Sequence, residues 1–349
     1  MKQLFYIITL AFVFISCKKE NDTLFQNKVE EETAVSSGIE VAAYKWYQMP
    51  VPTISNPSNT SNMIVQVNGD TYALAGGALT SWYKLNNNTK RWETTNGLNV
   101  FGGFGTGQQY FFSYQSKVYF GMNRTNDSID HRFIAADAIT NTYSYMAAFP
   151  GIPVTGPTCF VIGNKGYIMG GTNHGSYPVN QLWEYNFTTN TWTNKGSSPL
   201  SARASATAMV VGDKAYLGLG YRLIVSNNQL VKDYKNDWVI YDPIANSSTV
   251  MASFPAAKRA DAKGFVLGSS IFIGFGRSTT INSTSAYNDF YRYSTTNNEW
   301  TVQSFWPSSI GNSYGTNIAT FAVGNKGYLL KGNMTEFWCF SNTPIIQQQ

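Results

Sequence analysis

The sequence predicts an all-β protein built as a six-bladed β-propeller. Three observations predict this fold class. A strand–turn–strand segment recurs along the chain, an aromatic strand follows nearly every copy, and Asn, Ser, Thr, Gly and Tyr are abundant while charged residues make up only 13% of the 349 residues. Such a composition is typical of strands joined by polar turns. Self-similarity at a regular spacing is the signature of repeat architectures.

The N-terminus has the pattern of an export signal. A short cationic start, Met1–Gln3, precedes the apolar run Leu4–Ile15, which is too short to span a membrane. Phe14-Ile15-Ser16-Cys17 resembles the lipobox of a bacterial lipoprotein, which implies acylation of Cys17 and stable attachment to a membrane through several acyl chains. We therefore expect an outer-membrane lipoprotein that faces the periplasm or the cell surface. The alternative is an uncleaved anchor or an ordinary secretory signal with an incidental cysteine.

Residues 18–43 have low hydrophobicity and include Glu30-Glu31-Glu32 and Ser36-Ser37-Gly38. This stretch predicts a flexible tether between the signal and a folded domain at residues 44–343. The two further cysteines, Cys159 and Cys339, are too few for a disulfide framework or a zinc site, and we expect both to be buried small hydrophobic residues.

The charge pattern argues against nucleic acid as a partner. The formal net charge is +5, and the Lys and Arg residues are scattered along the chain rather than gathered in a basic stripe.

Three copies of the repeat are clear: Val161–Gly171, Val210–Gly220 and Ala322–Gly332. Each reads as a strand, a tight turn and a second strand, because a Gly-Asn or Gly-Asp pair supplies the positive φ that such a turn needs. Weaker copies begin at Val67, Tyr114 and Leu267. The equivalent second-strand ends lie 46 to 56 residues apart, at Gly77, Asn123, Gly171, Gly220, Gly276 and Gly332.

An aromatic third strand and a fourth strand follow the hairpin in most units. The third strands are expected at Trp82–Leu85, Leu182–Tyr185, Trp238–Tyr241, Phe290–Tyr293 and Phe337–Phe340, and tryptophans of the fourth strand at Trp192 and Trp300. Four strands per unit make one blade of a propeller.

These residues resemble the kelch repeat, which has a diglycine after the second strand, a tyrosine in the third and a tryptophan in the fourth. The resemblance covers about residues 44 to 340, and together with the lipobox it is to kelch-repeat lipoproteins of Bacteroidetes-like bacteria, in the galactose-oxidase/kelch superfamily. The sequence departs from the pattern at several sites. Only Gly76-Gly77 and Gly170-Gly171 are true diglycines, Met122-Asn123 replaces one, and Ser248 stands where the fourth repeat should have tryptophan.

The sixth unit ends after Phe340 and lacks an outer strand. Tyr44–Pro50 looks like the missing strand, since tryptophan followed by proline also marks the outer strands at Trp192 and Trp300. We expect the two ends of the chain to pair and close the ring, which removes exposed sheet edges.

The starts of the inner strands supply the first candidate binding residues. The strands are expected to start at Asn62, Gln108, Gly156, Ser205, Asp261 and Asn317, and all of these except Gly156 are candidates. The kelch resemblance implies that this ring borders the central channel on the face that carries ligand sites. Asp261 and Lys263 are expected as the one charged pair there. The alternative is that these polar groups only hold water and cap strand ends.

The connections between second and third strands are long in blades 2 to 5. They contain the candidate binding residues Arg124, Arg222, Tyr234 and Arg277, with His131, His174, Tyr177, Lys232 and Tyr287 nearby. Long loops on a rigid scaffold are the usual place for binding function. Aromatic residues beside Asn, Arg and Lys suit a sugar or a peptide, and the alternative is that these tyrosines only pack.

The sequence therefore favours a non-catalytic binding scaffold, without a cofactor, for a glycan, peptide or protein. The alternative is a cofactor-free sugar epimerase resembling sialic-acid mutarotases, with Asp261 and Lys263 as proton acceptor and donor. Arg203 and Arg259 are available to that site, although their repeated position indicates a structural role. A copper oxidase of the galactose-oxidase type ranks third, because only His131 and His174 are available as histidine ligands.

Overall fold

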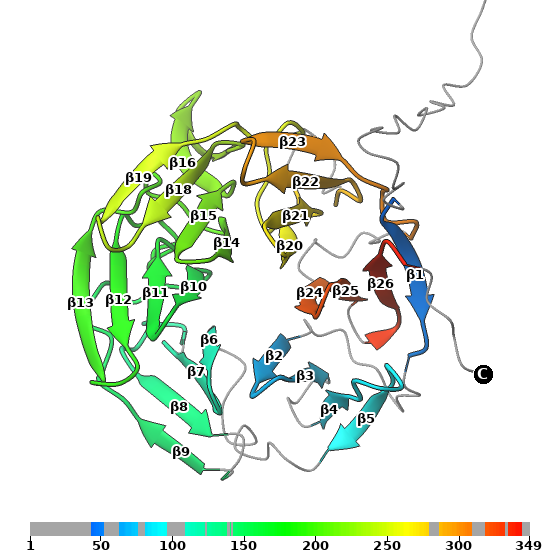
Figure 1. Ribbon diagram of the computed structural model, residues 1–349. Coiled ribbons are helices and arrows are strands. Elements are labelled where there is room, and N and C mark those ends of the chain that lie inside the picture. Colours follow the sequence, from blue (N-terminus) through cyan, green and yellow to red (C-terminus); the bar gives the residue numbers. More distant parts are fainter. Residues whose placement is uncertain are drawn as a thin grey trace, which may run out of the picture. The chain divides into compact units, whose positions relative to one another are not determined.

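A computed structural model describes residues 43–51, 63–75, 81–95, 109–122, 124–137, 140, 142–278, 286–308, 318–331 and 334–343. The export signal, Cys17 and all but the last residue of the expected tether lie outside these residues. The described residues form six four-stranded antiparallel sheets arranged in a ring, and each sheet is a blade (Figure 1). The predicted six-bladed propeller is confirmed. No helix in the described ranges is long and apolar enough to cross a membrane.

In blades 1 to 3, strand order along the chain is also strand order across the sheet. Blade 1 consists of β2 (Met63–Val67), β3 (Asp70–Ala75), β4 (Ser81–Leu85) and β5 (Trp92–Thr95). Blade 2 consists of β6 (Gln109–Tyr114), β7 (Lys117–Gly121), β8 (Phe133–Asp137) and β9 (Thr142–Tyr145). Blade 3 consists of β10 (Thr158–Ile162), β11 (Lys165–Met169), β12 (Leu182–Asn186) and β13 (Thr191–Gly196). The first strand of each blade lies nearest the centre of the ring (Figure 1).

Blade 4 departs from this pattern because a hairpin is inserted between its second and third strands. The blade consists of β14 (Thr207–Val211), β15 (Lys214–Gly218), β18 (Trp238–Asp242) and β19 (Ser247–Val250). The inserted hairpin consists of β16 (Tyr221–Ser226) and β17 (Gln229–Tyr234), which form a separate two-stranded sheet. Blade 5 is regular, with β20 (Lys263–Leu267), β21 (Ser270–Gly274), β22 (Phe290–Ser294) and β23 (Glu299–Val302).

Blade 6 joins the first and the last of the described strands, as the sequence predicts. Its inner strands are β24 (Ile318–Val323), β25 (Lys326–Lys331) and β26 (Phe337–Ser341), and its outer strand is β1 (Lys45–Met49). The register pairs Trp46 with Phe340 and Met49 with Phe337. Tyr44, just before β1, stacks on Phe340 with ring centroids 5.1 Å apart.

The hydrophobic core lies between neighbouring blades. Separate clusters join blade 1 to 6, 2 to 3, 3 to 4, 4 to 5 and 5 to 6. The repeat tyrosine and tryptophan belong to these layers. In blade 3 the hydroxyl of Tyr185 donates to Oδ1 of Asn190 over 2.8 Å, and Nε1 of Trp192 donates to the carbonyl of Ala147 in the preceding blade over 2.9 Å. Tyr293, Asn298 and Trp300 repeat this arrangement in blade 5.

The diglycine position shows why glycine is not always required there. Gly170, Leu219 and Phe275 occupy the first position with φ of 61°, 61° and 60°, so two blades tolerate a bulky residue in a left-handed conformation. The second position is stricter. A Cβ on Gly220 would lie 2.7 Å from the carbonyl oxygen of Ala204, which leaves no room for a side chain.

Candidate functional site

The inner strands of blades 3, 4 and 5 begin at a ring of backbone hydrogen bonds. Gly156, Ser205 and Asp261 each stand two residues before their inner strand, and their φ values are 59°, 53° and 58°. The amide of Ser205 donates to the carbonyl of Gly156 over 3.4 Å, and the amide of Asp261 donates to the carbonyl of Ser205 over 3.0 Å. For Ser205 and Asp261 the left-handed conformation costs about 1–2 kcal/mol. Residues strained in this way cluster at functional sites.

We use the name mouth for a set of residues in blades 2 to 5. It contains Gly156, Ser205 and Asp261 and the residues that stand at equivalent positions, three residues after the second strand of each blade. Those residues are Arg124, Thr172, Tyr221 and Arg277. Asn62, Gln108 and Asn317, the expected members of the ring from blades 1, 2 and 6, lie outside the described residues.

Arg277 is the ion partner of Asp261. Nε of Arg277 donates to Oδ2 of Asp261 over 2.8 Å, and both side chains are partly exposed. The two meet because the backbone of Arg277 exchanges two hydrogen bonds of 2.9 Å with Ala260. Lys263, the other charged residue expected at the mouth, begins β20, where its backbone pairs with Gly274. Lys263 forms no ion pair with any aspartate or glutamate of the described ranges, so the ion partner of Asp261 is Arg277.

Tyr221 of blade 4 is held near this ion pair of blade 5 by the backbone, because Tyr221 exchanges two hydrogen bonds of 3.0 Å with Ala204 and the next residue, Ser205, accepts from the amide of Asp261. Burial raises the pKa of the Tyr221 phenol, the charge of Asp261 and the neighbouring Tyr234 raise it further, and Arg277 opposes them. The ammonium of Lys232 lies 4.5 Å from the centre of the Tyr221 ring. A phenol, a carboxylate and two cations from two blades therefore share one small region of the mouth.

The other candidates on the inserted hairpin have partners within it. Arg222 donates to Asp233 over 2.8 Å, and Lys235 contacts the same carboxylate oxygen at 2.6 Å. The hydrogen bond from Lys235, aided by that from Arg222, holds the pKa of Asp233 below its usual range. Tyr234 is buried, with its ring centre 6.0 Å from that of Tyr221. Tyr234 therefore supports Tyr221 and is not itself a surface for a ligand.

Arg124 and the two histidines hold loops together. Nη2 of Arg124 donates to the carbonyl of His174 over 2.9 Å, and Nε2 of His174 lies 2.9 Å from the carbonyl of Asn126. Nδ1 of His131 lies 2.7 Å from the carbonyl of Phe149.

The described residues contain no group of three or more His, Cys, Asp or Glu side chains placed to hold a metal ion. Cys159 and Cys339 are free thiols, and burial raises the pKa of Cys339 to about 11.

Residues 113–332 match the family described as the KLHDC2/KLHL20/DRC7 Kelch-repeats domain. The chain belongs to the kelch-repeat family. Among solved structures, this kelch propeller is similar to the one titled "Structure of YjhT", with 15% sequence identity and a TM-score of 0.61, over 81% of this chain and 92% of that chain. At this identity the likeness shows the fold alone. No curated protein matches the sequence.

Two arginines of the kelch repeat form buried ion pairs, and we call each pair an arginine latch. Arg203 and Arg259 stand four residues before the inner strands of blades 4 and 5, and both are almost fully buried. Arg203 forms two hydrogen bonds with the carboxylate of Asp237, at 2.6 and 2.8 Å, and Arg259 forms two with Asp289, at 2.5 and 2.7 Å. Each also donates to a backbone carbonyl. These contacts fasten the link that enters each blade to the third strand of the same blade.

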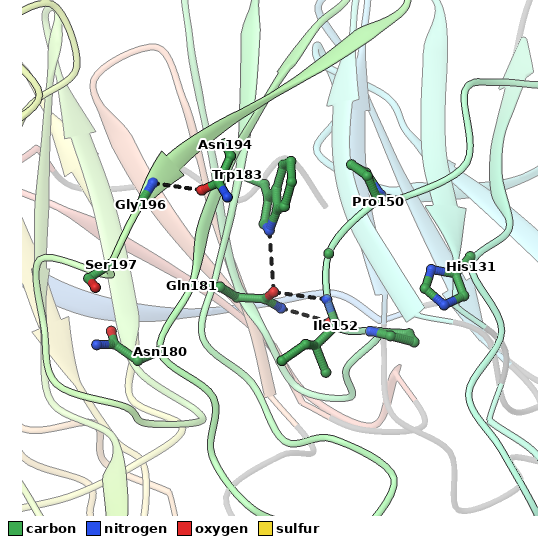
Figure 2. Close-up of a pocket in the computed structure, with 11 residues that line it drawn as sticks. His131, Pro150, Ile152, Asn180, Gln181, Trp183, Asn194, Gly196 and Ser197 are labelled. Atoms are coloured by element: carbon green, nitrogen blue, oxygen red, sulfur yellow. Dashed lines mark hydrogen bonds between the residues drawn. The ribbon is translucent and has the colours of Figure 1, made fainter.

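A cavity of about 660 Å³ lies between blades 2 and 3, and sequence reasoning missed most of its lining (Figure 2). The link between the two blades, the entrance of β12 and the end of β13 form its walls. The lining residues are His131, Pro150, Gly151, Ile152, Pro153, Asn180, Gln181, Trp183, Asn194, Gly196 and Ser197. Only His131 was among the residues singled out from the sequence. We call this hollow the rim cavity.

Proposed function

We propose that this kelch propeller is a non-catalytic binding module of the bacterial cell envelope, held at the outer membrane by a lipid on Cys17, and that its mouth binds an acidic glycan. The observation that carries the proposal is that the backbone hydrogen bonds of Ala204 and Ser205 bring Tyr221 of blade 4 and the Asp261–Arg277 pair of blade 5 together at the mouth. A rigid scaffold that brings polar side chains of separate loops together is the usual architecture of a binding site.

The charge around this part of the mouth favours an anionic ligand. Two cationic side chains, Arg277 and Lys232, and one carboxylate, that of Asp261, lie around Tyr221, and Lys263 stands two residues after Asp261. Because Asp261 is already paired with Arg277, the ammonium of Lys263 adds a charge that no described carboxylate neutralises. An excess of one charge on a surface raises the local concentration of ligands of the opposite sign.

The side chains also suit a ligand rich in hydroxyl groups. Arg277 and Lys263 supply donors for a carboxylate, and the Tyr221 hydroxyl and Asp261 supply a donor and acceptors for sugar hydroxyls. The Asp261–Arg277 pair holds both side chains in place before a ligand arrives, which reduces the ordering cost of binding. A carboxylate-bearing saccharide uses all of these groups at once.

The proposal is tested by applying the full-length protein to an array of acidic glycans, neutral glycans and peptides. Acidic glycans should give the strongest signals. Arg277→Gln should lower them at least tenfold, since a hydrogen bond to a charged group contributes about 1.5–3 kcal/mol. Lys214→Gln is the matched control, because it removes a cation paired with Asp242 at the hairpin end of blade 4, away from the mouth. Binding of peptides alone, or signals unchanged by Arg277→Gln, would refute the proposal.

A further inference from the structure

The rim cavity lies in blade 3 beside Gln181, at a place where this blade lacks the arginine latch of blades 4 and 5. Val154 and Gln181 occupy the positions of Arg259 and Asp289. The Gln181 amide fastens the incoming link: Oε1 accepts from the amide of Ile152 over 3.0 Å, and Nε2 donates to the carbonyl of Ile152 over 2.7 Å.

Trp183 is held in a fixed orientation on the cavity wall (Figure 2). Its Nε1 donates to Oε1 of Gln181 over 3.3 Å, and its ring meets Phe149 edge-on at 5.8 Å. Gly151 permits this arrangement, because a Cβ there would lie 2.4 Å from Nε1 of Trp183. The cavity therefore has a half-buried aromatic side chain, Trp183, in its wall, and the indole N–H of this side chain already has a hydrogen-bond partner.

The side-chain amides of two asparagines in the cavity wall have a fixed orientation and an NH₂ group without a hydrogen-bond partner in the described residues. Oδ1 of Asn180 accepts from the amide of Ser198 over 3.0 Å, and Oδ1 of Asn194 accepts from the amide of Gly196 over 2.7 Å. These backbone donors fix which end of each amide is oxygen. The NH₂ groups of both asparagines make no hydrogen bond within the described ranges.

His131 adds an acceptor to these donors. Its Nδ1 must carry the proton to donate to the carbonyl of Phe149, so Nε2 of the neutral ring is an acceptor. The hydroxyl of Ser197 is both a donor and an acceptor, and the wall contains no Lys, Arg, Asp or Glu side chain. A ligand that fits this wall is uncharged and offers both donors and acceptors beside an apolar face.

We propose that the rim cavity is a second binding site, separate from the mouth, for a neutral saccharide unit. Sugar hydroxyls both donate and accept, and the C–H face of a pyranose ring packs on an aromatic side chain such as Trp183. The volume of about 660 Å³ lies within the range of small-ligand sites. The site is built by residues of blades 2 and 3 and does not depend on the acidic-glycan proposal for the mouth.

Asn180→Asp and Asn194→Asp test the site with little change of shape. Each keeps the oxygen that accepts the backbone amide and replaces the free NH₂ donor by an acceptor. Asn186→Asp is the matched control in the same blade, because Oδ1 of Asn186 accepts from the amides of Thr188 and Thr189 at the opposite end of β12. Saturation-transfer NMR with cellobiose, lactose, maltose and chitobiose measures binding to the full-length protein.

At least one of these disaccharides should bind wild type, and its affinity should fall at least tenfold in Asn180→Asp and in Asn194→Asp. Asn186→Asp and the mouth variant Arg277→Gln should leave the affinity unchanged. No binding of any of the four sugars, or equal binding by wild type and both cavity variants, would overturn the proposal. If Arg277→Gln alone abolished the signal, the sugar would be bound at the mouth and the rim cavity would not be a site.

Discussion

The indole N–H of Trp46 donates a hydrogen bond to the carbonyl of Ser304 over 3.0 Å, which ties the outer strand of blade 6 to the end of blade 5. Trp192 and Trp300 donate in the same way to a carbonyl of the preceding blade, over 2.9 and 2.8 Å. Trp46 is therefore the fourth-strand tryptophan of blade 6, although β1 precedes every other strand of the described residues.

Trp46→Ala should lower the free energy of unfolding by about 2–4 kcal/mol, because it removes a half-buried indole packed against Phe265, Phe290 and Phe340. Lys45→Ala, at an exposed site of the same strand, should change it by less than about 0.5 kcal/mol. Chemical denaturation measures both.

A deletion of residues 18–40 should be nearly neutral, and a deletion extended to residue 52 should sharply lower the melting temperature. Equal melting of the two truncated proteins would contradict closure through β1.

Asp289→Ala should destabilise the protein by about 3–5 kcal/mol, because it leaves the fully buried guanidinium of Arg259 without its counter-charge. Asp130→Ala breaks the solvent-exposed pair with Arg132 and should cost less than about 1 kcal/mol. Thermal melts at neutral pH compare the two variants. Similar losses in both would mean that the latch is not a buried structural pair.

Glu336 should make the protein sensitive to acid. Burial tends to raise the pKa of this carboxyl, but hydrogen bonds from Lys331, Ser308 and Trp338 outweigh burial and hold it below the usual value near 4.5. The stabilisation is therefore fully present above that usual value and is lost as the pH falls through the lower folded value. The difference in melting temperature between wild type and Glu336→Gln should shrink on acidification through this window. A difference that stays constant with pH would show that the carboxylate charge contributes nothing.

Cys17→Ser should release the protein from membranes, since the Cys17 thiol is the expected acylation point. A fatty-acid probe should label wild type and leave the variant unlabelled, while Cys159→Ser should retain the label. If wild type carries no lipid label and the variant stays in the membrane fraction, the anchor prediction is wrong.

Local patterns were sufficient to predict the blades and their closure. The tight turns, the aromatic third strands and Trp46 all follow from spacings within the repeat, and the paired ends of blade 6 follow from counting strands. The hairpin β16–β17 was expected only as a long loop. Its alternation of apolar and polar residues is short, and a two-stranded ribbon depends on its anchoring beside Ala204, which sequence alone does not reveal.

The site was harder to predict than the fold. Asp261 pairs with Arg277 because a backbone bridge at Ala260 brings them together, whereas proximity in sequence favoured Lys263. Gln181, which lines the rim cavity, stands where blades 4 and 5 have the aspartate of an arginine latch. The absence of the latch from blade 3 can be recognised only once Arg203 and Arg259 are seen to be buried and paired.

The central claim, that the mouth binds a sugar acid without converting it, is tested most directly by NMR of N-acetylneuraminic acid and galacturonic acid with the full-length protein. The same spectra report saturation transfer, which measures binding, and exchange between anomers, which measures turnover. Wild type should bind at least one of the acids and leave the anomer exchange rate at its uncatalysed value, and the folded double variant Asp261→Asn/Lys263→Met should bind it less. A general acid and base pair contributes a factor of about 10² or more, so turnover would be evident. Accelerated anomer exchange that disappears in the double variant, or no binding of either acid, would contradict the account.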